Sequence, residues 1–242
     1  VKLIKSDYAT STLLGNDGDY KQAYTATGNA SSNYKGNNLA NIAAYTWNYK
    51  NNTTINIGYG SNTWSTSLLN KTNLNTNFIT NIGADWAAKI ADTTWKVGGN
   101  TWANIGEKSA KTAYQNEIVS PVTTNTTDNA TDYSAKVGLM YVSDYMYAAP
   151  QDKWALVGYN SDASKDYRAA TSVNWMYMGL WEWTFSRSAF NSNIAFFVNY
   201  TGYVFNNHVG NYAYGVRPVF YLSSSVNYAS GSGTAADPIL VN

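Results

Sequence analysis

The only histidine of the chain is the first residue to test for chemistry, because histidine titrates near neutral pH and often serves as a general acid or base. His208 stands between Asn207 and Val209, and no aspartate, glutamate or serine accompanies it nearby in the sequence. A catalytic histidine needs a second group that orients it or exchanges a proton with it. The pattern therefore favours a surface contact or an ordinary loop residue over a catalyst.

The carboxylates offer one arrangement that could act on a sugar. Glu182 lies between Trp181 and Trp183, and in a strand its side chain faces away from both indoles. It could hydrogen-bond sugar hydroxyls beside exposed indoles. The alternative, which the pattern favours, buries both tryptophans and leaves Glu182 solvated. Glycoside hydrolysis generally needs a second carboxylate, and no motif pairs two of the 15 acidic residues. We therefore expect no enzyme, and a glycan-acting enzyme is the least favoured hypothesis.

Two segments space their oxygen donors as a calcium-binding loop does. Their donors are Asn16, Asp17 and Asp19 in the first segment and Asn160, Asp162, Ser164 and Asp166 in the second. The second segment lacks the glycine and the glutamate that an EF-hand loop requires at its sixth and twelfth positions. Both segments are interpreted as turns. Neither a metal ion nor another cofactor is expected, and calcium is the weaker alternative.

The composition excludes several classes of function. Charged residues make up 13% of the chain, about half of the usual ~25%, and the net charge is +1. Nucleic-acid binding needs a basic patch that neutralises phosphates, and docking on anionic membranes needs clustered lysine or arginine, so neither is expected. The chain has no cysteine, which removes disulfides, thiol nucleophiles and cysteine-ligated metal sites.

The same composition indicates an exported protein. Low charge combines with abundant Asn, Thr, Ser and Tyr, and many extracellular bacterial proteins lack disulfides. The expected location is therefore extracellular or on a bacterial cell surface. The chain starts at Val1 without methionine and within an expected strand, so we expect an ectodomain whose export signal or anchor lies outside this sequence.

The elements that must position these residues follow from hydrophobic periodicity. Helical spacing covers 63–94, Ser143 is expected to cap a short helix, and 107–118 could form a helix or an extended arm. The expected strands cover 1–8, 46–60, 95–99, 136–141, 174–177, 181–185, 194–199, 203–206, 214–222 and 239–241. The predicted fold is one α+β domain of residues 1–242, with helices in the first half, an antiparallel sheet and long irregular loops.

The segment from Trp181 to Leu222 is the predicted binding surface. Its Tyr, Trp, Phe and Asn side chains offer a large contact area at low side-chain entropy, and residues near hairpin ends are expected to contact a ligand. These predicted contacts are Trp183, Arg187, Tyr200, Tyr203, Asn206, Asn207, His208, Asn211 and Tyr212. Arg217 and Pro218 are expected to be structural, because a guanidinium can bind several backbone carbonyls and brace loops.

Four segments together resemble a large group of surface proteins from gut Firmicutes and their relatives. They are Trp64-Ser65 with the Leu/Asn run after it, Lys136–Tyr141 with Ser143–Ala148, Trp181–Ser186, and Tyr214–Leu222 with Gly231–Thr234 and Asp237-Pro238. Many members of that group look like pilin-type secreted proteins. The resemblance therefore implies a subunit of a surface filament.

The segment Gly215-Val216-Arg217-Pro218 also resembles the Gly-Phe-Arg strand of C-type lectin-like folds. That resemblance implies a C-type lectin-like fold in which Arg217 braces the core and 189–212 forms a display face. Enzymes of that fold use cysteines, and its sugar-binding members hold calcium with Glu-Pro-Asn or Gln-Pro-Asp and Trp-Asn-Asp motifs. The chain contains none of these, so calcium-dependent sugar binding of that kind is not expected.

The leading hypothesis is a non-enzymatic recognition or adhesion domain that binds a glycan or a surface protein of a host or neighbouring cell. The aromatic and Asn-rich segment, without a catalytic set, motivates it. The alternative is a structural subunit of a bacterial surface filament, which would make a second copy of the chain its partner. Low charge and Thr- and Asn-rich faces suit close packing of such subunits.

Overall fold

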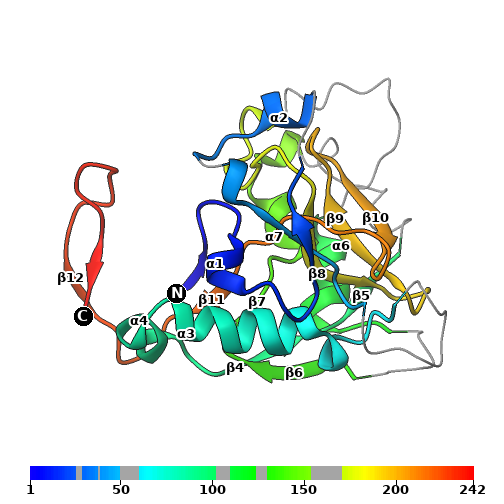
Figure 1. The fold of residues 1–242 in the computed structure, drawn as a ribbon, viewed down its shortest axis with the longest axis horizontal. Helices are drawn as coiled ribbons and strands as arrows, with labels where there is room; N and C mark the ends of the chain where they lie inside the picture. Colours follow the sequence, from blue (N-terminus) through cyan, green and yellow to red (C-terminus); the bar gives the residue numbers. More distant parts are fainter. Residues whose placement is uncertain (26–28, 38, 50–59, 102–109, 124–129, 154–170) are drawn as a thin grey trace.

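The computed structural model describes residues 1–25, 29–37, 39–49, 60–101, 110–123, 130–153 and 171–242. These residues form a mixed α/β structure with several antiparallel sheets and few helices. Figure 1 shows a helical segment along the lower side, the largest sheet on the right, and a hairpin that stands away from the body on the left. Among the described residues, none of the helices is both long and apolar enough to cross a membrane.

The largest sheet has the strand order β10-β9-β8-β5. Its strands are β5 (Gly99–Asn100), β8 (Glu182–Ser188), β9 (Ile194–Val198) and β10 (Val204–His208). β8, β9 and β10 pair antiparallel, and β5 joins β8 in parallel. Val198 pairs with Val204, so the chain reverses at Thr201-Gly202, as predicted, with Gly202 at a φ of 98°.

A second sheet joins distant parts of the chain in the order β1-β11-β7. Its strands are β1 (Lys2–Ile4), β7 (Val137–Gly138) and β11 (Val219–Tyr221), all antiparallel. Three two-stranded sheets complete the described strands. They are β2 (Tyr20–Ala23) with β3 (Ala43–Tyr45), β4 (Thr93–Lys96) with β6 (Asp132–Ala135), and β12 (Tyr228–Ser230) with β13 (Leu240–Val241).

The predicted helical region is present. It contains η2 (Trp64–Thr66), the π-helix η3 (Leu69–Phe78), α3 (Ile79–Asn81) and α4 (Ala84–Lys89). Asparagine side chains hold this region in place. Asn73 Nδ2 donates to the carbonyl of Leu14 at 2.8 Å, and Asn75 Nδ2 donates to the carbonyl of Asn70, five residues back, at 3.0 Å. Part of the Asn-rich composition therefore serves the fold, because buried amides satisfy backbone groups without introducing charge.

The remaining described helices are short. They are α1 (Ser11–Leu14), α2 (Asn29–Asn33), η1 (Leu39–Asn41), α6 (Ala110–Tyr114), η4 (Gln115–Val119), α7 (Val142–Tyr147) and η5 (Gln151–Lys153). The predicted cap at Ser143 is wrong: Ser143 lies inside α7, and the Asp144 carboxylate accepts the backbone N–H of Tyr141 at 2.9 Å. The predicted strand at 174–177 is also wrong, because the N–H of Tyr177 returns to the carbonyl of Asn174 in a turn.

A buried ion pair joins the start of β8 to the segment before β11. Arg217 Nε donates to Glu182 Oε1 at 2.7 Å, and Arg217 Nη2 donates to the carbonyl of Met176 at 2.6 Å. Both side chains are almost wholly buried, so the expectation of a solvated Glu182 is wrong. Burial raises the pKa of the Glu182 carboxyl above its ordinary value, although Arg217 acts in the opposite direction. Pro218 is also buried, and its carbonyl accepts the N–H of Lys5.

Candidate aromatic binding site

A row of aromatic side chains crosses three strands of the largest sheet. Trp183 lies opposite Phe197, and Phe197 lies opposite Phe205, so all three side chains share one face. The ring centroids of each neighbouring pair are 6.0 Å apart in edge-on contact. Trp183 and Phe197 are buried and Phe205 is half-buried, so the row runs from the core to the surface.

Tyr214 covers the buried end of this row. Its ring centroid lies 4.6 Å from the centroids of both Trp183 and Phe197. The Tyr214 hydroxyl accepts a hydrogen bond of 3.0 Å from Asn207 Nδ2, and Tyr212 stacks on the Tyr214 ring at 6.2 Å. Tyr212 is 46% exposed. Hence the Asn207 amide and the exposed Tyr212 ring extend the aromatic row toward solvent.

A surface groove of about 320 Å³ opens beside Tyr214. Segments far apart in the sequence form it: β2 and its continuation, β3, and the two segments that flank β8 and β10. We call it the aromatic groove; its lining residues are Gln22, Tyr24, Thr25, Ala44, Trp181, Tyr212, Ala213 and Tyr214. Its volume lies at the low end of the range of small-ligand sites.

Hydrogen bonds hold the walls of the aromatic groove. The backbone N–H of Trp181 donates to the Tyr24 hydroxyl at 3.1 Å, and the Trp181 carbonyl accepts the N–H of Gly215 at 2.9 Å. Beneath them, Trp183 Nε1 donates to the carbonyl of Tyr45 at 2.9 Å. The rings are therefore positioned before any ligand arrives, which lowers the entropy that a ligand must overcome.

The described lining of the aromatic groove is uncharged. The described residues that line it include no lysine, arginine, aspartate or glutamate. Burial raises the pKa of the Tyr24 and Tyr214 hydroxyls well above the ordinary value for tyrosine. Both phenols therefore stay protonated at physiological pH and can donate as well as accept hydrogen bonds.

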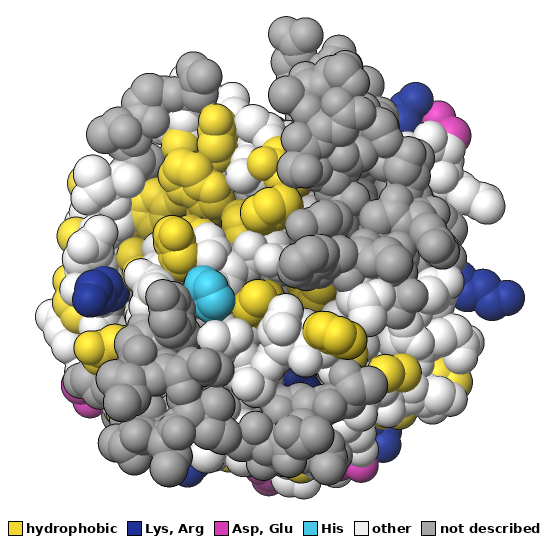
Figure 2. All heavy atoms as spheres, turned by 90° about the vertical axis from the view of Figure 1, so that its right-hand side faces the viewer, with side chains coloured by type: hydrophobic (Ala, Val, Ile, Leu, Met, Phe, Trp, Pro, Cys, Tyr) yellow, Lys and Arg dark blue, Asp and Glu magenta, His cyan; other side chains and the backbone are white. Residues whose placement is uncertain are grey.

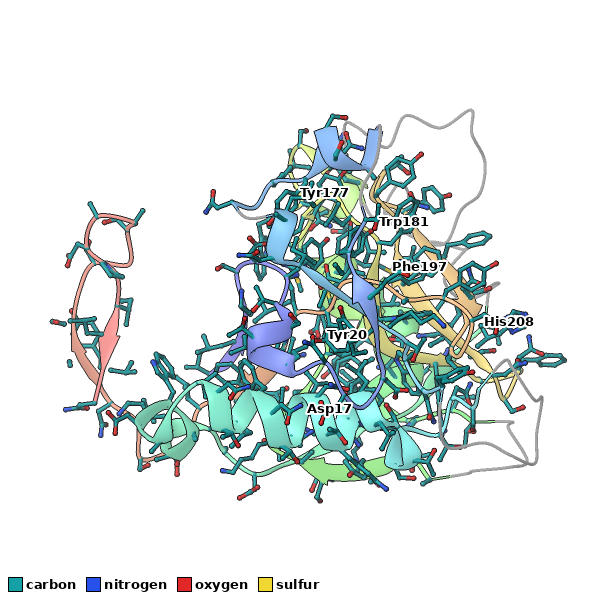
Figure 3. All side chains as sticks on the ribbon, viewed as in Figure 1. Asp17, Tyr20, Tyr177, Trp181, Phe197 and His208 are labelled. Atoms are coloured by element: carbon teal, nitrogen blue, oxygen red, sulfur yellow. The ribbon has the colours of Figure 1, made fainter. Side chains whose placement is uncertain are left out.

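Further half-exposed rings extend the groove into a wider surface. The Tyr200 ring lies 4.7 Å from Trp181, and the Tyr203 ring lies 6.1 Å from Phe205. Figure 2 shows apolar side chains gathered on this side of the molecule, directly beside the histidine. Figure 3 places Trp181, Phe197 and His208 along the same side. We call this surface the aromatic face; it comprises Trp181, Tyr200, Tyr203, Phe205, Asn207, Tyr212 and Tyr214.

The nine predicted ligand contacts differ in how far they are exposed. Tyr200, Tyr203, Asn207 and His208 are half-buried, and Asn211 and Tyr212 are exposed. Three others are corrected: Trp183 is 0% exposed, Arg187 is 1% exposed, and Asn206 is also buried. Arg187 donates to the carbonyl of Ala130 at 2.8 Å inside the protein. These side chains offer no contact surface, because β8 is covered on both faces and Asn206 points to the buried side of β10.

Sequence reasoning missed the other side of the groove. Tyr24 and Gln22 come from the first 25 residues, where the only sequence signal for binding is the oxygen-donor spacing at 16–19, to which neither residue belongs. The Trp-Glu-Trp motif draws attention to Trp181 but predicts it in the core, and it is half-buried. Tyr214 is predicted only as part of a strand. Its role depends on contacts with Trp183 and Phe197, which the sequence separates by 31 and 17 positions.

In the first of the two segments with calcium-like spacing, which we interpret as a turn, the two aspartates bind other parts of the protein. Asp19 is buried, and its two carboxylate oxygens accept the backbone N–H groups of Tyr49 at 2.9 Å and Leu69 at 2.8 Å. Asp17 Oδ1 accepts Asn77 Nδ2 at 2.7 Å. Both carboxylates therefore already bind protein donors. The second segment, 160–166, lies outside the described residues.

Glu117 is also a buried carboxyl, and it differs from Glu182 because it has no cationic partner among the hydrogen bonds of the described residues. Glu117 accepts hydrogen bonds from Ser186 Oγ at 2.5 Å, Asn100 Nδ2 at 2.7 Å and the N–H of Ser143 at 3.1 Å. Burial raises the pKa of Glu117 to about 7. Such a pKa suits acid–base catalysis, but Glu117 is wholly buried and does not line the aromatic groove. Its position indicates a structural role.

Comparison with known proteins identifies no homologue. No protein-family model, curated protein or solved structure matches this chain.

Proposed function

We propose that the chain is a non-enzymatic recognition domain that binds a neutral glycan through the aromatic face. The observation that carries the proposal is the aromatic groove: a fixed, uncharged hollow with tyrosine and tryptophan rings on its walls and amides at its rim. Aromatic rings stack on the apolar C–H faces of sugars, while phenol and amide groups bind hydroxyls. A neutral saccharide needs both kinds of contact and no counter-ion.

The charge of the groove selects among ligand classes. Sialylated, sulfated or phosphorylated ligands would need arginine or lysine, and the described groove residues supply neither. Gln22, Thr25 and Asn207 instead offer neutral donors and acceptors next to the rings. This mixture supports a glycan over an anionic surface protein as the ligand. Binding is proposed to be independent of calcium, because Asp17 and Asp19 already bind protein donors.

A C-type lectin-like arrangement is proposed for the fold, on an extracellular bacterial protein. Arg217 supports it, because its guanidinium joins Glu182 of β8 to the carbonyl of Met176 and thereby ties the final strands to the central sheet. A brace of this kind lets the loops of 199–214 form a binding surface on a rigid scaffold.

The test is binding of the purified, multimerised domain to an array of neutral and acidic glycans, with calcium and with a chelator. We expect retention on neutral glycans in both conditions. The double variant Tyr203→Ala/Tyr212→Ala should weaken binding at least about tenfold, because two stacking surfaces are lost. Phe190→Ala is the matched control, since Phe190 is 77% exposed and does not line the groove.

Two results would overturn the proposal. One is a double variant that binds every retained glycan as well as the wild type does. The other is an array on which only acidic glycans are retained, because that pattern requires a cationic site elsewhere on the molecule.

A further inference from the structure

The edge of the second sheet offers an unused strand-pairing position. Among the described residues, β1 has a single sheet neighbour, β11. The N–H of Leu222 donates to the carbonyl of Val1, and the N–H of Lys5 donates to the carbonyl of Pro218. Because hydrogen bonding alternates along an antiparallel strand, the main-chain groups of Lys2 and Ile4 point away from β11. These groups can pair with an incoming extended strand.

An apolar groove runs along this edge. It has a volume of about 510 Å³, with β1 on one wall and α7 on the other. Met140, Met176 and Val219 contribute apolar lining, and the rim includes Trp175, which is 70% exposed. Lys2 of β1 forms an ion pair with Asp144 of α7, so the described lining of the groove carries no unbalanced charge. A groove between an edge strand and a helix is the geometry in which peptides add as an extra strand.

The hairpin of β12 and β13 carries exposed apolar side chains, which are complementary to the apolar groove beside β1. Figure 1 shows it standing clear of the body. Its large apolar residues Tyr228, Ile239 and Leu240 are all more than half exposed. An isolated two-stranded hairpin is only marginally stable in water, so such a hairpin gains stability when a third surface covers it.

The loop of this hairpin is nevertheless well ordered by its own hydrogen bonds. The N–H groups of Ser232 and Gly233 both donate to the carbonyl of Asp237, at 3.1 Å and 3.0 Å. The Asp237 carboxylate accepts the same Ser232 N–H at 2.8 Å. The hairpin is therefore held in shape away from the core, as a strand donor must be to bind without a large loss of entropy.

We infer that the β12–β13 hairpin of one copy docks in the β1–α7 groove of a second copy and adds a strand to β1. The occupant is assigned to a second copy because the same chain carries both the exposed apolar strand and the apolar groove beside an unused strand edge. The hairpin's one charged side chain, Asp237, lies in its loop and not in the strands. Among the described lining residues, the only charges that Ile239 and Leu240 would meet are the paired Lys2 and Asp144.

This contact joins different surfaces of the two copies. Such a contact builds open chains unless its rotation closes a ring or two copies exchange hairpins. It uses neither the aromatic groove nor its lining residues, so an assembly of this kind would leave every aromatic face open. The inference therefore stands or falls separately from glycan binding.

Sedimentation of the purified chain over a concentration series tests the contact. The wild type should self-associate. The donor variant Ile239→Asp/Leu240→Asp and the acceptor variant Trp175→Asp should each raise the dissociation constant at least about tenfold. All three side chains are exposed in the single chain, so these changes leave its fold intact. Phe190→Asp, at an apolar position elsewhere that is more exposed than the three test positions, should associate as the wild type does.

Mixing the variants distinguishes this contact from non-specific association. A donor variant and an acceptor variant should each be monomeric but should form a heterodimer together, because one intact hairpin meets one intact groove. Since the chain has no cysteine, Leu240→Cys mixed with Trp175→Cys should form a disulfide-linked pair, whereas Leu240→Cys with Phe190→Cys should not. A wild type that stays monomeric at every concentration, or association that the variants leave unchanged, would overturn the inference and leave the groove to another strand donor.

Discussion

Strands β8 and β10 belong to the same sheet and carry similar residue types, but they expose them differently. β8 contains Trp183, Phe185 and Arg187, and all seven of its residues are buried. β10 contains Phe205 and Asn207, and three of its five residues are half-buried. β8 has a strand on each side, whereas β10 has one described neighbour. Position in the strand order, and not residue type, therefore separates the wholly buried residues from the partly exposed ones.

Because β8 is buried and the aromatic face is partly exposed, the same kind of substitution should have different effects in the two regions. A change in β8 removes packing or leaves a buried polar group without a partner, so it lowers the free energy of unfolding. A change on the aromatic face leaves the core intact and alters the contact surface. Substitutions in the two regions should therefore differ in what they change and by how much.

Trp183→Ala should lower the free energy of unfolding by about 5 kcal/mol, because it leaves a cavity between Phe197 and Tyr214 and removes the donor to the Tyr45 carbonyl. Chemical denaturation followed by tryptophan fluorescence or circular dichroism measures the change. A loss below about 1 kcal/mol would show that the Trp183 ring is not buried between Phe197 and Tyr214.

Arg217→Met should cost about 4 kcal/mol, because Glu182 is left as an unpaired buried carboxyl at the start of β8. The double variant Glu182→Gln/Arg217→Met removes that unpaired group and should recover a large part of the loss. Denaturation curves of wild type, both single variants and the double variant give the coupling energy. Additive losses would contradict a direct pair.

Glu117, which accepts a hydrogen bond from Ser186 of β8, should make stability depend on pH. Burial raises the pKa of the Glu117 carboxyl from 4.5 to about 7 in the folded protein. At a pH between these two values the carboxyl therefore keeps its proton in the folded protein and loses it in the unfolded chain. The stabilising contribution is complete below the unfolded pKa and is lost as the pH rises through the folded pKa, a decrease of about 3 kcal/mol.

Urea unfolding at a series of pH values from about 4 to about 8 measures this decrease, since the range spans both pKa values of the carboxyl. Glu117→Gln is the matched control, because the amide cannot ionise and its curve should be flatter over the same range. Equal pH dependence in the wild type and in the Glu117→Gln variant would assign the effect to a different group.

Tyr212→Ala should have the smallest effect on stability, under about 0.5 kcal/mol, because its ring is exposed and stacks only on Tyr214 among the described rings. The same change should weaken binding of a retained neutral glycan about tenfold. Thermal unfolding and titration of the glycan measure the two quantities. A large loss of stability would move Tyr212 from the contact surface into the structural group with Trp183.

Local patterns predicted several elements correctly. The helical spacing of Leu69, Leu74 and Phe78 placed η3, and the β-branched and aromatic runs placed β9 and β10 on either side of Thr201-Gly202. These elements follow from residues close together in the sequence, where periodicity and turn chemistry act. The strand predicted at 174–177 is absent because Asn174 accepts the N–H groups of Met176 and Tyr177, and these local hydrogen bonds form a turn.

The candidate site was predicted in part. Turn and strand chemistry indicated that Tyr200, Tyr203, Asn207 and Tyr212 gather near hairpin ends, and these residues are at least partly exposed. Strand alternation predicted that Glu182 faces solvent, and Arg187 was expected to be a ligand contact, but both side chains are buried. Alternation separates the two faces of a strand only when one face meets water, and β8 is buried on both.

The sequence by itself determined the low charge, the absence of thiol chemistry and the aromatic, Asn-rich character of 181–222. Only the tertiary structure decided which aromatic residues are core and which are surface, and that Tyr24 and Gln22 line one groove with Trp181 and Tyr214. The reason is physical. Composition and periodicity report local preferences, whereas burial depends on which strands become neighbours, and those pairings join residues far apart in the chain.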